Sequence, residues 1–244
     1  PPPPSSVVWW ARRCVYETGF WDAPLERIEI LIEEFQDIAE AFALADELLG
    51  RPLEPAVEAE VYYLKAKGLY YQDDLEPALF LLRRALQTHP DVAAYLAFEG
   101  QILLDLGRLD GARTSLDRAL ALEPDLPDAH NNLGNALKDL GKPGEALTQH
   151  RRAIFLDPQN DLFWAGLASS LETLSFASID DNLYQDLLHL VERPTVRPSY
   201  VVRPIINALR HHPDFSRIVE LTGSGQPEDG FNYGNVAEHL SAIP

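Results

Sequence analysis

A pair of adjacent histidines, His211 and His212, is the most obvious candidate for metal chemistry in the sequence. A zinc site needs three or four ligands that converge on one point, whereas the side chains of adjacent residues diverge. No third ligand stands at metal spacing from the pair. We therefore interpret both histidines as surface residues at a helix end, where a cationic side chain is favourable. The sequence predicts no metal site.

A glycine-rich acidic stretch, "ELTGSGQPEDG", begins at Glu220. It is faintly similar to the turns that bind nucleotides or S-adenosylmethionine, which need a strand before the glycines and a helix after them. The preceding "HPDFSRIVEL" predicts a short helix instead of a strand. We interpret Gly223 and Gly225 as a helix stop followed by a loop. No cofactor is predicted.

A carboxylate pair, Asp180 and Asp181, could in principle serve as a general acid and base. The pair stands directly before "NLYQDLLHLV", which predicts an amphipathic helix. Aspartate is favoured at the residue that caps a helix N-terminus, because its side chain accepts hydrogen bonds from unpaired backbone amides. We interpret the pair as an N-cap, and the sequence predicts no catalytic residue.

The composition of the chain excludes several classes of partner. It has 20 basic and 38 acidic residues, and the net charge of −18 repels the phosphate backbone of nucleic acids. No run approaches the length of about 18 apolar residues that a membrane span needs. The N-terminal "PPPPSSVVWWARRC" lacks the apolar stretch of a secretory signal, and a single cysteine, Cys14, predicts a reducing compartment. We therefore predict a cytoplasmic protein that binds neither nucleic acid nor membrane.

A period of 34 residues organises the middle of the chain. Pro90, Pro124 and Pro158 follow one another at this spacing, and they close the similar phrases "ALFLLRRALQTHP", "ARTSLDRALALEP" and "ALTQHRRAIFLDP". Alanines recur at fixed distances before these prolines, and such small side chains let two helices approach closely. They are Ala78, Ala112 and Ala146 and, seven residues later, Ala85, Ala119 and Ala153.

Each repeat also carries an earlier helical pattern. A small residue is followed three positions later by leucine, which places both on one buried face of a helix. The connecting stretches "YYQDDLEP", "LDLGRLDG" and "KDLGKPGE" contain the residues that end one helix and begin the next. Each repeat therefore predicts a helical hairpin. The small residue and leucine pairs are Ala66 and Leu69, Gly100 and Leu103, Gly134 and Leu137, and Ala168 and Leu171.

These residues resemble the tetratricopeptide repeat. The resemblance is closest between Pro127 and Pro158, which include "AHNNLGNALKDLGKPGEALTQHRRAIFLDP". It implies an all-α fold, a right-handed superhelix in which helical hairpins form a solenoid, with helical caps at both ends. The repeat array is expected over residues 59–175, with units 59–92, 93–126 and 127–160 and a partial unit 161–175.

Three segments lie outside the expected repeats. Residues 23–58 predict two helices that form a degenerate hairpin and cap the solenoid, whose terminal faces would otherwise expose core. Residues 1–22 combine a proline run with an aromatic stretch, and we expect them to dock on the solenoid or on another molecule, the alternative being a disordered tail. Residues 176–244 predict a C-terminal extension of four short amphipathic helices.

The resemblance also implies a binding surface, since the first helices of such repeats line a concave groove. Tyrosines at one end could anchor an extended or helical peptide, and amides farther along could bind its backbone. Alternatively, Tyr62, Tyr63, Tyr70 and Tyr71 seal the joint with the degenerate first unit. The candidate groove residues are Tyr63, Lys67, Tyr70, Gln101, Asn131, Asn135 and Lys138.

Two known uses of the family do not fit these positions. Members that clamp the acidic tails of heat-shock chaperones present several Lys, Arg and Asn residues, whereas the few here are diluted by acidic neighbours. Glycosyltransferases with these repeats carry an asparagine before the leucine of each first helix. This chain has Asn132 there, but Leu64, Phe98 and Gly166 in the other units.

We expect a protein–protein interaction module that binds a peptide or a partner protein in the groove. The partner is expected to be basic or neutral, because the chain is acidic. Residues 176–244 are similar to the linker of bacterial proteins in which these repeats precede an S-adenosylmethionine-dependent methyltransferase. We therefore expect a non-catalytic N-terminal part of a larger bacterial protein. The alternatives are a regulatory or substrate-recruiting part of a methyltransferase or glycosyltransferase, and a self-assembling scaffold.

Overall fold

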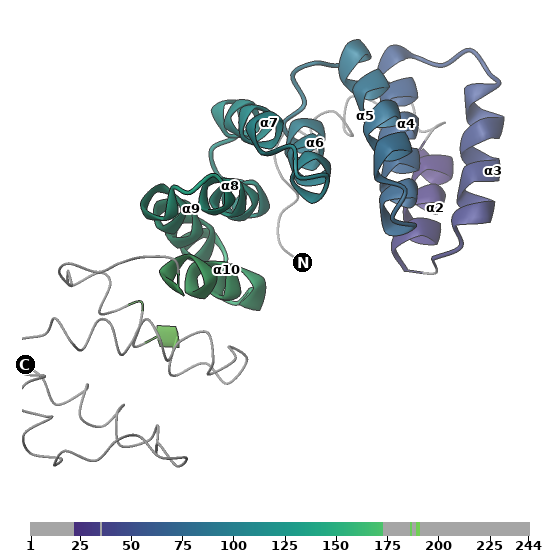
Figure 1. Cartoon of the computed structure of the whole chain (residues 1–244). Helices are drawn as coiled ribbons and strands as arrows, with labels where there is room; N and C mark the ends of the chain where they lie inside the picture. Colours follow the sequence, from purple (N-terminus) through teal and green to yellow (C-terminus); the bar gives the residue numbers. More distant parts are fainter. Residues whose placement is uncertain (1–21, 35, 173–185, 187–188, 191–244) are drawn as a thin grey trace, which may run out of the picture. The chain divides into compact units, whose positions relative to one another are not determined.

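A computed structural model describes residues 22–34, 36–172, 186, 189 and 190. Over these residues the chain forms α-helices joined by short turns, without a strand (Figure 1). The predicted fold class, an all-α helical-repeat array, is therefore confirmed. The chain divides into two compact units, residues 1–136 and 137–244, and the division falls within one helix.

Successive helices within each unit pack on one another, and the contacts are most extensive for α4 with α5 and for α6 with α7. In chain order the helices are α2 (Asp22–Glu33), α3 (Ile38–Leu49), α4 (Pro55–Tyr71), α5 (Leu75–Thr88), α6 (Ala93–Asp105), α7 (Leu109–Leu122), α8 (Pro127–Asp139), α9 (Pro143–Leu156) and α10 (Asp161–Glu172).

The two helices predicted to form an N-terminal cap, α2 and α3, pack on each other and on α4. Their shared core is aliphatic and includes Ile28, Ile32 and Leu64. Helix α3 begins after Asp37, whose side chain accepts a hydrogen bond of 3.1 Å from the backbone amide of Glu40, as the N-cap preference requires. Helix α4 begins at Pro55 and not at residue 59, because proline suits the first turn of a helix.

The 34-residue pattern of small residues coincides with the packing between helices. All six alanines before the repeat prolines are completely buried, at 0% exposure. Gly100 and Gly134 are also buried on the first helices of their repeats, together with Leu103 and Leu137. The predictions are confirmed at these positions, whereas Leu69 in the first repeat is only half-buried. The close approach between helices depends on residues with little or no side chain.

The turns inside the three hairpins share one backbone conformation. Asp73, Gly107 and Gly141 stand 34 residues apart, and each has a positive φ, of 65°, 70° and 76° respectively. In each turn the next residue donates a backbone hydrogen bond of 2.8–2.9 Å to a leucine carbonyl near the end of the preceding helix. Only glycine adopts this left-handed region without steric strain, so Asp73 holds a conformation that suits its glycine counterparts better.

We therefore expect Asp73→Gly to stabilise the first repeat. Relief of the strained conformation should outweigh the entropy that glycine adds to the unfolded chain, for a net gain of about 0.5–1 kcal/mol in the free energy of unfolding. The reciprocal change Gly107→Asp should lower this free energy by a similar amount. Urea unfolding followed by circular dichroism measures both, and a loss of stability in Asp73→Gly would contradict the expectation.

Several predictions concern residues outside those that the structure describes, and they stay predictions. They include the docking of the N-terminal segment, residues 1–22, of which the structure describes only Asp22, and the thiol of Cys14. The helices of the C-terminal extension and its likeness to methyltransferase linkers also belong to this group. So do the roles given to Asp180, Asp181, His211, His212, Gly223 and Gly225.

Candidate functional site

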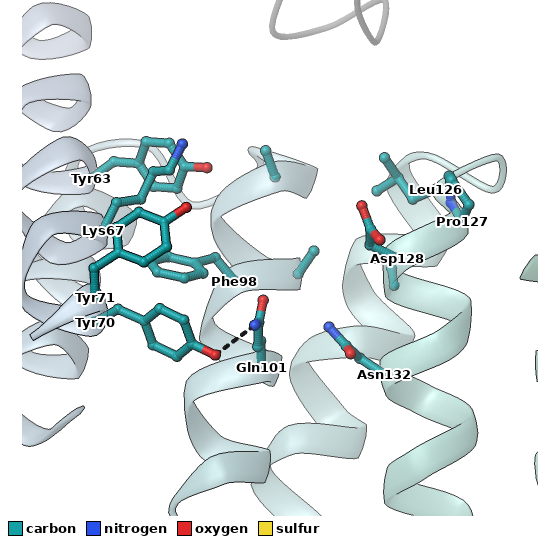
Figure 2. Close-up of a pocket in the computed structure, with 13 residues that line it drawn as sticks. Tyr63, Lys67, Tyr70, Tyr71, Phe98, Gln101, Leu126, Pro127, Asp128 and Asn132 are labelled. Atoms are coloured by element: carbon teal, nitrogen blue, oxygen red, sulfur yellow. Dashed lines mark hydrogen bonds between the residues drawn. The ribbon is translucent and has the colours of Figure 1, made fainter. Parts of the chain in front are cut away.

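A pocket of about 340 Å³ lies in the first unit, between the first helices of three successive repeats. Figure 2 shows α4 as one wall, α6 as the floor and α8 as the opposite wall. The lining residues are Tyr63, Lys67, Tyr70 and Tyr71 from α4, Ala94, Ala97, Phe98 and Gln101 from α6, and Leu126, Pro127, Asp128, Ala129 and Asn132 from α8 and the turn before it.

Helical spacing brings these side chains to one face. Tyr63, Lys67 and Tyr70 are separated by four and three residues, and residues at this spacing are neighbours on a helix surface. The floor contributes Ala94 and Ala97, whose small side chains leave the space between the walls open. The pocket is therefore a consequence of the repeat register and of small residues in the central repeat.

An aromatic cluster joins the α4 wall to the floor. The ring of Tyr63 stacks on Tyr95 with a centroid distance of 4.7 Å and meets Phe98 edge to face at 5.7 Å. Tyr70 meets the same Phe98 edge to face at 5.3 Å. Such pairs stabilise a joint by about 0.5–1.5 kcal/mol each beyond the area they bury. Tyr63 and Tyr70 thus help to hold the first two repeats together.

A short polar chain fixes the position of Tyr70. Gln101 donates a hydrogen bond of 2.7 Å from Nε2 to the Tyr70 hydroxyl, which donates one of 2.8 Å to Oδ2 of Asp105. Burial and the bond to Asp105 raise the pKa of Tyr70 to about 12. The phenol therefore stays protonated and keeps its role as a donor at neutral pH.

Lys67 is engaged with residues of this chain. Its Nζ pairs with Glu33 of α2 and lies 5.7 Å from the centroid of the Tyr63 ring. Burial lowers the pKa of Lys67, but the electrostatic influence of Tyr63 and the bond to Glu33 outweigh burial and raise it. Burial and the charge of Glu60 raise the pKa of Tyr63 to about 12, although the charge of Lys67 acts to lower it. The ammonium is charged, and a carboxylate already balances it.

Other parts of the pocket remain accessible. Tyr71 is 54% exposed and contacts Tyr70 edge to face at 6.1 Å. Asp128 and Asn132 stand on the α8 wall across from it (Figure 2). The pocket thus presents an aromatic ring on one side and polar groups on the other.

Four of the seven predicted groove residues line this pocket: Tyr63, Lys67, Tyr70 and Gln101. Asn131, Asn135 and Lys138 lie on α8 but do not line it. Lys138 falls in the second unit, where its Nζ donates a hydrogen bond of 3.0 Å to Ser169. The pocket therefore gathers the predicted aromatic end of the groove, and the binding role of all seven residues stays a prediction.

Phe98 and Asn132 are among the pocket side chains that sequence reasoning missed. In the sequence, Asn132 stands out only as the single asparagine at the position where glycosyltransferases with these repeats carry one in every unit. The two residues stand 34 apart, at one phase of the repeat, and this shared phase was the available signal. Leu64, at the same phase one repeat earlier, is buried in the core that α4 shares with α2 and α3.

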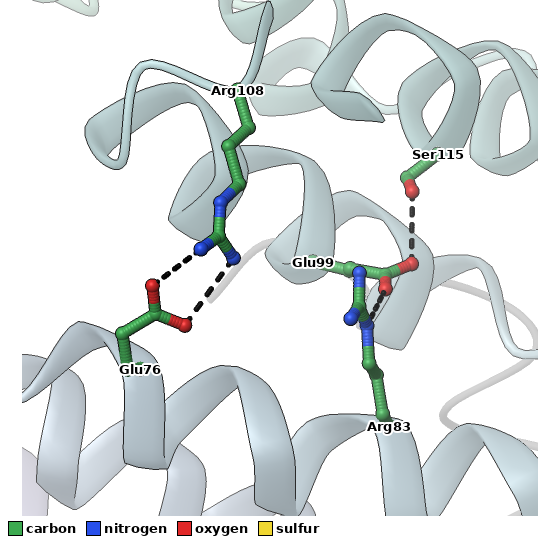
Figure 3. Close-up of polar contacts among 5 residues, drawn as sticks. All are labelled: Glu76, Arg83, Glu99, Arg108 and Ser115. Carbon is green, nitrogen blue, oxygen red and sulfur yellow. Dashed lines mark hydrogen bonds and ion pairs between the residues drawn. The ribbon is translucent and has the colours of Figure 1, made fainter. Parts of the chain in front are cut away.

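A buried carboxylate outside the pocket has a structural role. Glu99 of α6 is 8% exposed, and it accepts a hydrogen bond of 2.8 Å from Ser115 and one of 3.0 Å from Arg83 (Figure 3). Nearby, Arg108 makes two hydrogen bonds to Glu76, of 3.2 and 2.5 Å. Both oxygens of Glu99 are engaged, so the group links α5, α6 and α7 instead of facing a substrate.

The part of the chain that the structure describes shows neither a metal-binding group of side chains nor a membrane-spanning helix. It holds no group of three or more His, Cys, Asp or Glu side chains that could bind a metal ion. None of its helices combines the length and the apolar composition needed to cross a membrane.

Comparison with protein families identifies the repeats. Residues 100–141 match the family model described as TPR repeat, and residues 127–160 match the one described as Tetratricopeptide repeat. Residues 100–160 therefore match tetratricopeptide repeats. The resemblance is thus confirmed over these residues, while no curated protein matches the chain in sequence.

Solved structures share the fold. A MamA fragment from Desulfovibrio magneticus RS-1 is 19% identical with a TM-score of 0.52, over 62% of this chain and 82% of that one. Another MamA structure is 16% identical with a TM-score of 0.51, over 70% and 88%. The second TPR domain of human RPAP3, in complex with an HSP70 peptide, is 20% identical with a TM-score of 0.46, over 48% and 98%. At these identities the two MamA structures show a common helical-repeat fold and no more.

Proposed function

We propose that this chain is a protein-interaction module that binds a peptide segment of a partner protein in the pocket between α4, α6 and α8. The observation that carries the proposal is the exposed ring of Tyr71 facing polar groups across an open pocket. Rigid aromatic side chains bury a large area on binding at little cost in conformational entropy, and they are enriched among residues that dominate binding energy.

Polar groups in the pocket suit a peptide backbone. Asn132 and Gln101 each carry both a donor and an acceptor, and they lie on different helices. A peptide that crosses from the α4 wall to the α8 wall would place its amides near them, with an apolar side chain against Leu126 and Pro127. The volume of about 340 Å³ admits side chains of a peptide that otherwise runs along the surface.

The alternative role of the tyrosines is to seal the joint with the cap, and Tyr63 packs against the core of that joint. Tyr62 is buried, while Tyr63 and Tyr70 hold neighbouring helices together. Replacing any of these three would disturb packing as well as binding. Tyr71 is the informative residue, because its ring is mostly exposed and its loss should leave the repeats folded.

Selection from a phage-displayed library of random dodecapeptides tests the proposal. The bait is the whole chain in three forms: wild type, Tyr71→Ala and Phe80→Ala. Phe80 is a matched control, since this residue is 64% exposed on α5 and lies outside the pocket. Peptides enriched on the wild type should bind Tyr71→Ala at least tenfold more weakly and Phe80→Ala equally well. Equal affinity for all three baits would reject the pocket as the binding site.

The finer expectations from the sequence belong to this proposal. The partner is basic or neutral, and the protein is cytoplasmic. No contact among the described residues favours self-assembly or a methyltransferase or glycosyltransferase role over peptide binding. We therefore keep one candidate function.

A further inference from the structure

The surroundings of the pocket are acidic, although its lining contains one lysine and one aspartate. Side chains that bond directly to lining residues add two carboxylates, Glu33 on Lys67 and Asp105 on Tyr70. Glu60 lies close enough to Tyr63 to influence its ionisation. Four carboxylates thus line the pocket or lie beside its lining residues, against one ammonium. An acidic ligand would meet this excess of negative charge, and the ammonium that could attract it is already paired.

The chain itself shows how its tyrosines accept cations. The Lys67 ammonium lies over the Tyr63 ring, at 5.7 Å from the centroid. The Arg84 guanidinium lies over Tyr62, at 4.3 Å from the centroid. Electron-rich ring faces attract cations within about 6 Å. Tyr71 belongs to the same cluster, but more than half of its surface is exposed to solvent.

A carboxylate stands across the pocket from this ring. Asp128 lies in the first turn of α8, where the positive end of the helix dipole favours an ionised carboxylate. Figure 2 shows it on the wall opposite Tyr71, with the small residues of α6 between the two walls. A cation that enters the pocket would therefore find a ring on one side and an anion on the other.

We propose that the pocket is an arginine subsite: an arginine side chain of the bound peptide stacks its guanidinium on Tyr71 and pairs with Asp128. The inference rests on the proposed function and names the side chain that the pocket selects. Arginine is favoured over lysine because its guanidinium is planar, weakly hydrated and able to form two parallel hydrogen bonds with a carboxylate. Gln101 and Asn132 can accept its remaining donors through their amide oxygens.

The same peptide selection, carried one step further, tests the subsite. Peptides that depend on Tyr71 are sequenced, and representatives are synthesised with each arginine replaced in turn by citrulline, which keeps the shape and removes the charge. Binding is measured by fluorescence anisotropy to the wild type, Asp128→Asn and Asp110→Asn. Asp110 is the matched control, because it occupies the first turn of α7 as Asp128 does that of α8 and lies outside the pocket.

We expect one arginine to recur in the selected peptides and its citrulline variant to bind at least tenfold more weakly. Asp128→Asn should reduce affinity for the arginine peptide by a similar factor and for the citrulline peptide much less, whereas Asp110→Asn should change neither. Peptides that need Tyr71 but contain no arginine, or that tolerate citrulline and Asp128→Asn, would overturn the subsite and leave the proposed function standing. Selection of no Tyr71-dependent peptide would overturn both. Both mutated aspartates are exposed, and a thermal melt of each variant verifies that it folds.

Discussion

Replacing His150 by leucine is expected to stabilise the repeat formed by α9 and its neighbours and to remove a large loss of stability in acid. His150 is completely buried on α9, and neither ring nitrogen has a hydrogen-bond partner among the described residues. The residues 34 and 68 positions earlier are Leu116 and Leu82, both completely buried. A histidine therefore occupies a position that the other repeats fill with an aliphatic side chain.

Burial and, to a smaller extent, the charge of Lys138 together lower the pKa of His150 to about 4. Between the ordinary pKa of 6.5 and this value the unfolded chain binds more protons than the folded one. Stability must then rise with pH in this window: it is complete above about pH 6.5 and is lost as the pH falls toward 4. The loss at pH 5 amounts to about 2 kcal/mol, relative to pH 7.5.

Urea unfolding at pH 7.5 and pH 5 compares the wild type with two variants. His150→Leu should gain about 1–3 kcal/mol at pH 7.5, because it removes an unsatisfied buried polar group. It should also show a pH-dependent loss smaller than that of the wild type by about 2 kcal/mol. His150→Gln, which is polar but does not titrate, should lose the acid effect without the gain at pH 7.5. If the pH-dependent loss is the same in all three proteins, His150 does not titrate as its burial implies.

The helical repeats could be predicted from the sequence because they follow from local rules. Prolines, small residues and turn residues recur at fixed positions of the 34-residue repeat, and each position has the same structural role in successive repeats. Prediction from the repeat pattern failed where one repeat carries a residue of a different type at a position that the other repeats fill with glycine or leucine. Asp73 takes the positive φ of Gly107 and Gly141 although it is not glycine. Because histidine is polar, the sequence likewise did not indicate that His150 is buried.

The pocket was harder to predict because it depends on how successive first helices face one another. Spacing places Tyr63, Lys67 and Tyr70 on one face of α4, but it does not show which side chains of α6 and α8 lie opposite. The hydrogen bonds of Tyr70 join residues 31 and 35 positions apart, and such contacts follow from the packing of repeats. The sequence did not predict that Phe98 and Asn132 line the pocket, for the same reason. The sequence therefore predicted the α4 wall best and the α8 wall least.

Adding a single methyl group at Gly100 is expected to destabilise the second repeat. A Cβ atom there would lie 2.8 Å from Cδ2 of Leu116 and closer still to its Cγ, well inside van der Waals contact. Leu116 is completely buried, so its side chain cannot move aside into solvent. Overpacking of this kind costs about 1–3 kcal/mol. The better helix propensity of alanine, worth up to about 1 kcal/mol, offsets only part of that cost.

Matched glycines elsewhere in the repeats separate packing from propensity. Gly144 lies in the first turn of α9, and a methyl group added there would have nothing within 4 Å, so Gly144→Ala should be neutral or slightly stabilising. Gly111→Ala would meet Leu103 at an ordinary distance of 3.4 Å and should change little. Circular dichroism melts and urea unfolding compare the three variants.

A double-mutant cycle identifies the side chain responsible. Leu116→Ala alone should cost about 2–5 kcal/mol, since it leaves a cavity. In that background Gly100→Ala should be neutral or stabilising, because the methyl group enters the space that the leucine vacated, and the coupling between the two changes should exceed about 1 kcal/mol in favour of the double variant. Additive effects, or a Gly100→Ala protein as stable as the wild type, would show that α6 and α7 are not packed as closely as the distance between Gly100 and Leu116 requires.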